Sequence, residues 1–382
     1  MPHDSTFDVA IIGAGIAGVS AAAALAPSAR VLLIEKEAQP AYHATGRSAA
    51  ILAQTYGNDV IRALTHASDR FLRSPPDGFC DHPLLSPRGL VLIARSDQLL
   101  RLRADYDALE SDLLEWIEPK ALEAEIPILR PGYVAGGFAN RAAQDVDVHA
   151  LVQGYLRRFR QDGGHVRTGQ EVTGLHREGA GWRVQLGAEA VTASTVVNAA
   201  GAWADHVATL AGAQPLGLRP LRRSAVTLRP PAGLDVGQLP MIVDADERFY
   251  LKPEAGMLLA SPANETLSDP TDAQPEEMEI AIAIDRVTTA FDLDVRRIES
   301  KWAGLRTFAP DRSPVCGFDP EVPGFFWLAA QGGFGVQTAP ALSQITAHLV
   351  SGAALDEDLI ETGLNLTRLA PDRDNRNWIW PT

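Results

Sequence analysis

The sequence predicts an α/β protein built from two unlike parts, and three observations carry that prediction. A short apolar run near the N-terminus is followed by a glycine-rich turn, an alanine-rich stretch and a second apolar run, which is the order of a parallel β-α-β unit. Between about residues 216 and 287 the chain instead alternates short β-like runs with turns, as an antiparallel sheet does. A chain of 382 residues is also long enough for two domains.

The parallel unit occupies the N-terminal end of the chain. Phe7–Ile12 (FDVAII) has the length and apolar character of a buried strand, and GAGIAG follows at Gly13–Gly18. A helix is expected to about Leu25, ended by Pro27, and a second strand is expected at Val31–Ile34. This order of strand, turn, helix and strand predicts a Rossmann-like unit that binds a dinucleotide.

Each glycine of the turn has its own expected role. Gly13 makes the tight turn, Gly15 lets the pyrophosphate approach the backbone, and Gly18 lets the helix pack closely on the strand. Glu35 stands 22 residues after Gly13, where an acid accepts the ribose hydroxyls. The GAGW stretch at Gly179–Trp182 is predicted to be a hairpin turn and not a second fingerprint. Spacing alone leaves FAD and NAD open as the dinucleotide.

The composition limits the class of protein. The formal net charge is −14, so binding to nucleic acid is not expected. There is no run of about 18 apolar residues, so no transmembrane segment is expected, and the N-terminus lacks the basic region of a signal peptide. The two cysteines, Cys80 and Cys316, form no CxxC motif and favour a reducing compartment. The expected location is the cytoplasm, with a peripheral association with the inner membrane left open, and no metal site is expected.

Segments along nearly the whole chain resemble one family. They are AYHATGRSAAILAQTY, GFCDHPLLSPR, VVNAAGAW, PLRRSA, FYLKPEAGMLLASPAN, WAGLR and GFFWLAAQGGFGVQT, which begin at residues 41, 78, 196, 220, 249, 302 and 324. In order and spacing they are similar to the D-amino-acid oxidase family of flavoproteins, and in particular to its bacterial D-arginine dehydrogenase branch. The resemblance implies FAD as the cofactor and a substrate oxidised at a carbon that carries an amine.

The resemblance also assigns residues to the cofactor. The loop Thr45–Ser48 is expected along the flavin, Val172 is expected where the adenine meets a strand, and the helix that follows Gly332–Gly335 is expected to point its positive end at the flavin. Sarcosine-oxidase relatives attach their flavin through a cysteine where this chain has Gly304, so non-covalent FAD is expected. The full set implied for cofactor binding is Gly13, Gly15, Ile16, Ala17, Gly18, Glu35, Lys36, Thr45, Gly46, Arg47, Ser48, Ala49, Val172, Ala200, Gly201, Trp203, Gly332, Gly333, Gly335, Val336 and Gln337.

The same resemblance implies two discontinuous domains. An FAD-binding domain is expected to contain residues 1–85, 141–215 and 302–382. A substrate-binding domain, with a mixed and largely antiparallel sheet and flanking helices, is expected to contain residues 86–140 and 216–301. Within the second domain, a turn at Pro253–Gly256 is expected to join the strands FYLK and MLLAS. The chain is therefore expected to cross between the domains several times.

Five residues are implied for the catalytic site. A substrate carboxylate buried beside a flavin needs a guanidinium, whose planar fork matches it and stays charged. In the family, arginines at the positions of Arg223 and Arg306 hold that carboxylate, helped by tyrosines at the positions of Tyr56 and Tyr250. The carbonyl of Gly333 is expected to accept a hydrogen bond from the substrate amine.

The expected side-chain pocket departs from the D-arginine branch. That branch pairs the substrate guanidinium with an acid where this chain has Leu90, and it has a histidine and a threonine where this chain has Ile51 and Ala53. A guanidinium buried without a partner against Leu90 and Ile51 would cost several kcal/mol. D-Arginine is therefore expected to be a poor substrate, and an apolar or uncharged side chain is expected to be preferred.

The expected reaction is oxidative deamination. A hydride passes from the α-carbon to flavin N5, and the imino acid then hydrolyses to a 2-oxo acid and ammonia, so no protein base is required at the carbon. His43 is expected near the flavin without a catalytic role. The electron acceptor is left open among a quinone, a dye-like carrier and oxygen. Two alternatives stay open: a glycine- or sarcosine-type amine oxidase that uses oxygen, and a 2-hydroxy-acid dehydrogenase.

Overall fold

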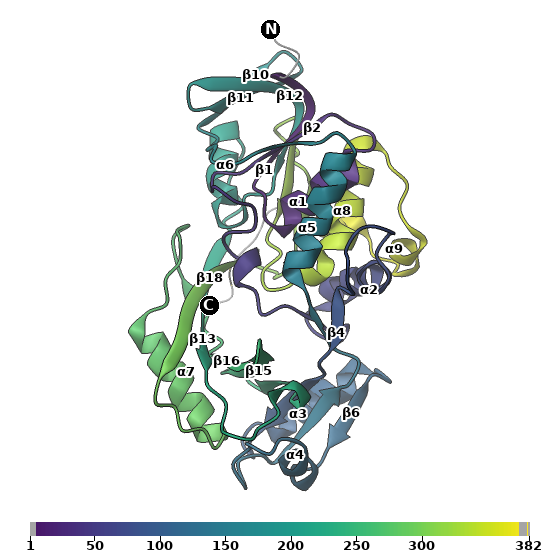
Figure 1. Ribbon diagram of the computed structural model, residues 1–382. Coiled ribbons are helices and arrows are strands. Elements are labelled where there is room, and N and C mark those ends of the chain that lie inside the picture. The colour runs from purple at the N-terminus through teal and green to yellow at the C-terminus, as the bar shows by residue number, and fades with distance from the viewer. Residues whose placement is uncertain (1–4, 374–379, 381–382) are drawn as a thin grey trace.

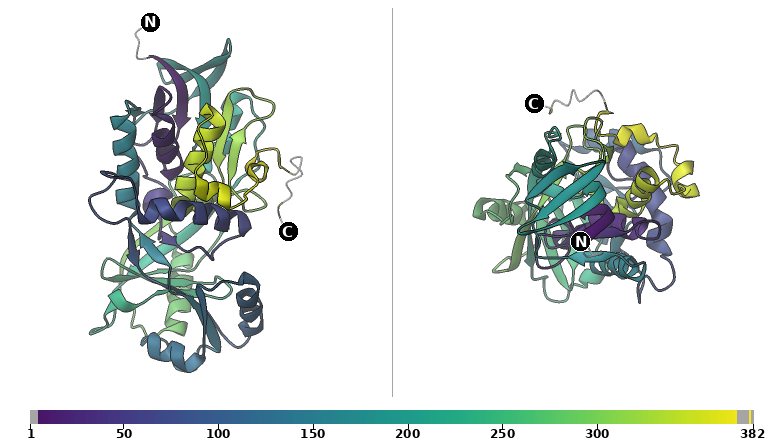
Figure 2. Two further views of the ribbon diagram at one scale, coloured as in Figure 1. Left: turned by 90° about the vertical axis from the view of Figure 1, so that its right-hand side faces the viewer. Right: turned by 90° about the horizontal axis from the view of Figure 1, so that it is seen from above.

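The structure, a computed structural model that describes residues 5–373 and 380, has two lobes that are each built on a large sheet (Figures 1 and 2). The upper lobe of Figure 1 contains the N-terminal β-α-β unit, and the lower lobe draws its strands from several separate stretches of the chain. A small third sheet joins β3 (Ile51–Leu52), β8 (Gln144–Val146) and β4 (Leu85–Pro87), and β4 is drawn at the junction of the lobes. The predicted α/β fold class is confirmed.

The sheet of the upper lobe has a parallel centre with antiparallel additions. Its strand order is β10-β11-β12-β1-β2-β9, and β20 pairs in parallel with β12 and antiparallel with β19. The pairs β12-β1, β1-β2 and β2-β9 are parallel. The strands are β1 (Thr6–Ile12), β2 (Val31–Ile34), β9 (His165–Arg167), β10 (Gly174–Glu178), β11 (Gly181–Leu186), β12 (Glu189–Asn198), β19 (Val315–Phe318) and β20 (Phe325–Ala329).

Both faces of this sheet are buried. Along β1, Val9 and Ile11 pack in the core formed with α1, α2, α5 and α8, while Ala10 and Ile12 pack in a second core on the face covered by α6. Because α1 is enclosed, it is apolar all round and rich in alanine, unlike an amphipathic surface helix. The helices are α1 (Ile16–Leu25), α2 (Asp59–Arg73), α5 (Val148–Gln161), α6 (Ala204–Ala211), α8 (Gly335–Ser351) and α9 (Glu357–Glu361), with short 3₁₀ turns η2 (Thr45–Arg47), η3 (Gly201–Trp203) and η5 (Leu366–Leu369).

The sheet of the lower lobe is mixed and largely antiparallel, as predicted. Its order is β17-β13-β16-β15-β14-β5-β7-β6, with β18 paired to β13, and only the β14-β5 pair is parallel among the described strands. The strands are β5 (Leu90–Ala94), β6 (Leu114–Ile117), β7 (Gly136–Asn140), β13 (Arg219–Leu228), β14 (Met241–Asp244), β15 (Tyr250–Glu254), β16 (Met257–Ser261), β17 (Thr266–Leu267) and β18 (Ile298–Phe308). The accompanying helices are α3 (Leu99–Leu109), α4 (Pro119–Glu125) and α7 (Glu277–Ala290), with the 3₁₀ turn η4 (Val236–Gln238).

The two longest strands of the lower lobe, β13 and β18, form an antiparallel pair that points toward the upper lobe (Figure 1). Leu221 lies opposite Arg306, and Arg223 lies opposite Gly304. Residues two apart on a strand share a face, so Arg223 and Arg306 project from the same face as diagonal neighbours. Gly304 leaves the position beside Arg223 without a side chain.

Several local predictions are confirmed. The stretch at Gly179–Trp182 contains the turn of the antiparallel hairpin β10-β11. A turn joins β15 to β16 as expected, but it is shorter than Pro253–Gly256, because Pro253 and Glu254 still pair within the sheet. Helix α8 ends at Ser351, and Gly352 follows in the left-handed region with φ of 72°. The expected domain boundary at residue 302 falls inside β18, whose pairing with β13 starts at Ile298. The boundaries of the two domains otherwise stay a prediction.

Candidate active site

A large cavity lies where the β-α-β unit meets β18 and the start of α8. Of the residues expected at the cofactor, all but Gly18, Gly46 and Gln337 line it. Those in its wall are Gly13, Gly15, Ile16, Ala17, Glu35, Lys36, Thr45, Arg47, Ser48, Ala49, Val172, Ala200, Gly201, Trp203, Gly332, Gly333, Gly335 and Val336. His43 lines it too. The structure therefore brings together residues that are separated by more than three hundred positions in the sequence.

The glycine turn shows three different reasons for glycine. Gly13 has φ of 100°, and a Cβ there would lie 2.5 Å from the carbonyl oxygen of Ala199. A Cβ on Gly18 would lie 1.8 Å from the carbonyl oxygen of Gly13, so this glycine serves the packing of α1 on β1. A Cβ on Gly15 would meet only the Thr45 hydroxyl, at 3.4 Å. The protein itself therefore does not exclude a side chain at Gly15, and the space beside it suits a ligand that approaches the backbone closely.

Glu35 is held at the end of β2 by backbone donors. Its Oε2 accepts a hydrogen bond from the N–H of Ala14 at 2.8 Å, and its Oε1 accepts one from the N–H of Glu37 at 2.9 Å. Each oxygen keeps a further lone pair, so the carboxylate can still accept ribose hydroxyls. Thr45 is held in a similar way, because its hydroxyl accepts the N–H of Ile16 at 3.0 Å in the first turn of α1.

Two polar side-chain atoms of the cavity wall have no hydrogen-bond partner among the residues that the structure describes. The Thr307 hydroxyl and the Gln331 amide nitrogen are buried without a hydrogen bond, and both residues line the cavity. A buried polar atom without a partner costs about 1–3 kcal/mol, so these atoms fit a bound group that carries hydrogen-bonding atoms of its own. Sequence reasoning missed both residues, although each is adjacent to a residue that it had selected, Arg306 and Gly332.

An aromatic cluster lies at the same cavity. The Lys36 ammonium lies 3.5 Å from the centre of the Trp203 ring, and the His43 ring lies 4.8 Å from the same ring. The His43 Nε2 is 2.9 Å from a carboxylate oxygen of Glu37. These contacts give His43 a structural role in holding the Trp203 side of the wall, which agrees with its exclusion from catalysis in the sequence-based hypothesis.

Two arginines line both the large cavity and a smaller chamber beside it. The Arg223 side chain is 8% exposed and donates from Nε to the carbonyl of Asn264 at 2.8 Å, with Glu265 at 3.4 Å. Burial lowers the pKa of Arg223, and the charge of Arg306 lowers it further. Arg306 differs from Arg223, because within the described chain its guanidinium has no hydrogen bond or ion pair. Its donors face the cavities, where an anion can accept them.

The remaining residues of the expected catalytic site also lie here. Tyr250 and Gly333 line both cavities, and Tyr56 lines the smaller chamber. A Cβ on Gly333 would lie 3.0 Å from a guanidinium nitrogen of Arg306, so glycine leaves room for that side chain. Four of the five residues therefore surround the passage between the two cavities, and Tyr56 stands on the side of the chamber.

The smaller chamber holds about 60 Å³ and is mainly apolar. Ile51 and Leu90, which were expected in the substrate pocket, line it. Ala53 does not; it is buried, and its N–H lies 3.4 Å from the side-chain oxygen of Gln337. The apolar wall is completed by Leu92, Met241, Val243, Ala263 and Phe334.

One acid in the wall of the chamber was missed by sequence reasoning. Glu247 accepts a hydrogen bond from the Tyr56 hydroxyl at 3.0 Å, while the Tyr56 ring lies 5.4 Å from that of Phe334. Burial raises the pKa of Tyr56 well above its usual value, and the Glu247 carboxylate raises it further, so Tyr56 is a neutral donor. Glu247 is exposed and lies on the turn between β14 and β15. No motif marks it in the sequence.

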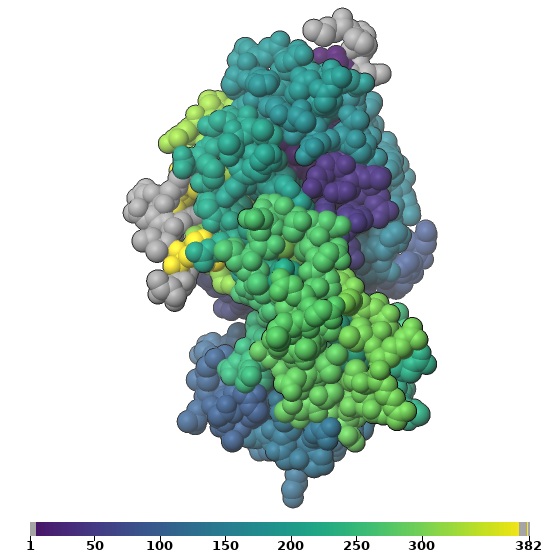
Figure 3. Space-filling model, turned by 90° about the vertical axis from the view of Figure 1, so that its left-hand side faces the viewer, coloured from purple at the N-terminus to yellow at the C-terminus, as the bar shows by residue number. Residues whose placement is uncertain are grey.

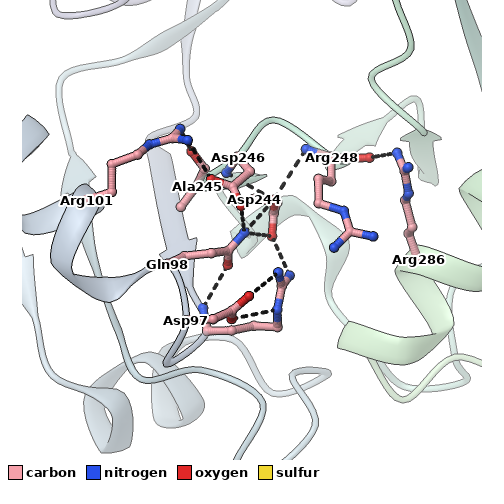
Figure 4. Close-up of polar contacts among 9 residues, drawn as sticks. Asp97, Gln98, Arg101, Asp244, Ala245, Asp246, Arg248 and Arg286 are labelled. Atoms are coloured by element: carbon pink, nitrogen blue, oxygen red, sulfur yellow. Dashed lines mark hydrogen bonds and ion pairs between the residues drawn. The ribbon is translucent and has the colours of Figure 1, made fainter.

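A buried network fixes the turn that carries Glu247 (Figure 4). Asp244 is 1% exposed and accepts hydrogen bonds from the Gln98 amide at 3.1 and 3.2 Å and from Arg95 at 3.2 Å. It also accepts the backbone N–H groups of Asp246 and Arg248, at 3.1 and 3.3 Å. Glu247 itself has φ of 51°, which an L residue adopts only where its surroundings hold it there. Asp244 therefore determines where the Glu247 side chain lies.

The fold and the glycine-turn cavity are those of a dinucleotide-dependent oxidoreductase, and a smaller chamber that shares two arginines with this cavity lies beside it. The chain belongs to the family described as "DAO: FAD dependent oxidoreductase", whose model matches residues 8–349. FAD is the cofactor, and the cleft fits it, since the glycine turn leaves room for a pyrophosphate and the wall carries unpaired polar atoms. In the described part of the chain no helix is long and apolar enough to span a membrane.

Curated relatives share moderate identity with the chain. L-2-Hydroxyglutarate dehydrogenase of Escherichia coli K12 is 29% identical over 222 residues, which cover 55% of this chain and 51% of that protein. The chain thus matches about half the length of this relative. The uncharacterised oxidoreductase YurR of Bacillus subtilis is 24% identical over 372 residues, covering 91% of this chain and 96% of the relative.

Solved structures share the fold. Glycine oxidase of Geobacillus kaustophilus superposes with a TM-score of 0.82 at 21% identity, covering 97% of this chain and 99% of that one. L-Proline dehydrogenase of P. horikoshii superposes with a TM-score of 0.83 at 20% identity, covering 98% and 99%. At this level of identity the likeness establishes the architecture, and substrates differ among the proteins that share it.

Proposed function

We propose that the protein catalyses the FAD-dependent oxidative deamination of D-amino acids. The electrons taken from the substrate pass finally to a separate electron acceptor. The observation that carries the proposal is Arg306, a guanidinium without a partner in the described protein that lines both the FAD cavity and the apolar chamber. A free guanidinium in such a place fits a carboxylate. The α-carbon of an acid held there would lie at the passage to the cofactor.

The bound FAD supplies the chemistry of this reaction, because it accepts a hydride from the substrate's α-carbon. The protein's residues bind and orient. Arg223 and Arg306 hold the carboxylate, the Tyr250 hydroxyl donates to it, and the carbonyl of Gly333 accepts an N–H of the neutral amine. The imino acid hydrolyses in water to a 2-oxo acid and ammonia, so no side chain has to act as a base at the α-carbon.

The chamber supports a preference for apolar or uncharged side chains. Leu90 and Ile51 offer no partner to a cation, and most of the other residues around the chamber are apolar. Glu247 stands in the wall as an acceptor, but its Oε1 is already bound to Tyr56. A long cationic side chain would have to reach this exposed carboxylate, where solvent screens the pairing and Tyr56 is already a donor. We therefore expect D-arginine to be a weaker substrate than D-leucine or D-methionine.

Anaerobic reduction of the bound flavin tests the proposal. D-Leucine, D-methionine and D-phenylalanine should bleach the flavin absorbance, and the corresponding L-amino acids should not. Steady-state kcat/KM for D-arginine should be lower than for D-leucine. Bleaching by L-amino acids alone, or a higher kcat/KM for D-arginine, would contradict the proposed specificity.

Replacing Leu90 with glutamate should move the preference toward D-arginine. A carboxylate introduced at this position would pair with a guanidinium inside the chamber, and hydrogen bonds to charged groups contribute about 1.5–3 kcal/mol. The ratio of kcat/KM for D-arginine to that for D-leucine should rise by about tenfold or more. The control is Leu90→Met, which keeps the volume and should leave the ratio near its original value. An unchanged ratio in Leu90→Glu would show that Leu90 does not face the substrate side chain.

Non-covalent attachment of FAD is supported by the positions of the cysteines. Neither Cys80 nor Cys316 lines the cavity, and both are free thiols. Cys316 is 1% exposed, and burial raises its pKa to about 12, so it is a poor nucleophile. Gly304, which does line the cavity, has no side chain to form a bond.

Two alternative substrates keep the same arginine pair. A glycine- or sarcosine-type amine oxidase is favoured by the structural likeness to a glycine oxidase, and a 2-hydroxy-acid dehydrogenase is favoured by the relatives that carry the name L-2-hydroxyglutarate dehydrogenase. Adding glycine, sarcosine and 2-hydroxyglutarate to the same anaerobic assay separates these from D-amino acids. Hydrogen peroxide formation in air, compared with reduction of a dye or quinone, identifies the acceptor.

A further inference from the structure

One irregular segment covers part of the cofactor cavity. Residues 268–275, here called the strap, connect β17 to the residues that precede α7. Thr271 and Ala273 of the strap line the cavity. The strap belongs to the lower lobe, whereas the glycine turn on the other side of the cavity belongs to the upper lobe. In Figure 3, purple atoms from the N-terminal part of the chain lie beside green atoms of the lower lobe at this junction.

Very few side chains hold the strap in place. The Arg47 guanidinium donates to the carbonyl of Ala273 at 2.9 Å and to the carboxylate of Asp272, with which it also forms an ion pair. The Tyr42 hydroxyl donates to the other oxygen of Asp272 at 3.2 Å. Within the described chain, residues 270–275 make no other hydrogen bond. Both ends of this stretch are prolines, which have no N–H to donate.

The arginine that holds the strap is itself well anchored. Arg47 also donates to the carbonyl of Ala303 on β18 at 2.8 Å, and its own carbonyl accepts the Trp302 indole N–H at 3.2 Å. Its guanidinium lies 5.2 Å from the centre of the Tyr42 ring. One side chain thus connects the loop that follows β2, the strap and β18.

The strap contacts a small apolar cluster on β18. Ala273 is 3% exposed and packs with Ala303 and Leu305 of β18. All three residues are buried, but two of them are alanines, so this cluster places little apolar area under the strap. By contrast, Asp272 is 46% exposed. The strap can therefore lift without disturbing either large core, provided that the contacts of Arg47 and Tyr42 to Asp272 break.

We propose that Arg47, Asp272 and Tyr42 form a clasp that retains FAD, and that the strap opens to let the cofactor enter and leave. Asp272 is the positioning residue of this clasp, because it acts on the cofactor through Arg47 and the strap and does not have to touch FAD itself. The inference rests on FAD occupying the large cavity and is independent of which substrate the enzyme oxidises.

Replacing Asp272 with asparagine tests the clasp. The substitution keeps the shape of an exposed side chain and removes the charge, so the ion pair with Arg47 is lost while the fold is preserved. Losing about 1–2 kcal/mol of clasp contacts corresponds to a roughly 5- to 30-fold faster release of FAD. Holoenzyme is diluted, and the rise of flavin fluorescence is followed with time. Asp272→Glu, which keeps the charge, should release FAD at a rate close to that of the wild type.

Matched controls separate the clasp from a general loss of stability. Asp358→Asn removes a partly buried carboxylate that pairs with the exposed Arg70 at 2.7 Å, away from the cavity wall, and should leave the release rate unchanged. High salt should accelerate release from the wild type, because it screens an exposed ion pair, and should have little effect on Asp272→Asn. Equal release rates for the wild type and Asp272→Asn would overturn the proposal. So would the absence of release from every variant, because the flavin would then be covalently attached. The assay contains no substrate, so its outcome does not depend on the proposed specificity.

Discussion

Replacing Arg306 with methionine should lower kcat/KM for the best D-amino acid by about 100- to 1,000-fold, because it removes one partner of a buried charge pair that forms when substrate binds. Of the two arginines, Arg306 is the better one to substitute in this experiment. It has no hydrogen bond or ion pair within the described chain, so its removal leaves no protein group unpaired. Arg223, by contrast, bonds to Asn264 and lies near Glu265, and its removal would disturb both.

The Arg306 measurement needs two further variants. Arg306→Lys keeps the charge but lacks the planar fork, so it should recover only part of the lost kcat/KM. Arg296→Met removes an arginine whose side chain is 86% exposed on the lower lobe, and it should behave like the wild type. If Arg306→Met kept the wild-type KM and kcat for every acid in the panel, the substrate carboxylate would have to bind elsewhere.

Replacing Gly15 with alanine should weaken FAD binding by about 10- to 100-fold while leaving the apoprotein folded, because an added methyl group in a tightly packed place costs about 1–3 kcal/mol. The backbone at Gly15 has φ of −70°, which alanine adopts without strain, and the nearest protein atom to the new Cβ is the Thr45 hydroxyl at 3.4 Å. The methyl group would therefore meet the cofactor and not the protein. Titration of apoprotein with FAD gives the dissociation constant, and thermal unfolding of the apoprotein gives the stability.

Gly18→Ala provides the contrasting case. Its Cβ would lie 1.8 Å from the carbonyl oxygen of Gly13, so helix α1 would have to move away from β1. This variant should lower the unfolding temperature of the apoprotein as well as the affinity for FAD. If Gly15→Ala also destabilised the apoprotein to the same degree, the glycine at position 15 would serve folding and not cofactor binding.

The sequence predicted best where the signal is local. The strand, turn and helix from Thr6 to Leu25 follow one another without a gap, so apolar runs and glycines were enough to find them. The long strand β18 was not predicted from the sequence: the motif WAGLR at Trp302 lies inside it, and its pairing with β13 begins at Ile298. Strand pairing between distant segments leaves no mark of that kind in a single sequence.

A single sequence shows local motifs but not contacts between distant residues, and this explains which site residues were predicted. Residues inside recognisable motifs, such as Arg306 and Gly333, were selected in advance and line the cavities. Glu247 was missed because its partner Tyr56 is 191 positions away and because a glutamate in a polar turn looks like any other surface residue. Thr307 and Gln331 were missed because only the packed structure shows that their polar atoms have no partner.

The pairing of β13 with β18 affects which residues of this enzyme can be substituted during evolution. Arg223 and Arg306 stand on adjacent strands in a fixed register, so the sheet determines the distance between their Cα atoms. Insertions in surface loops do not alter that distance. The walls of the chamber, in contrast, come from separate short strands and turns that can be substituted one residue at a time. If the two arginines bind the substrate carboxylate as proposed, substitutions in the chamber would change which side chain is accepted without changing the carboxylate site.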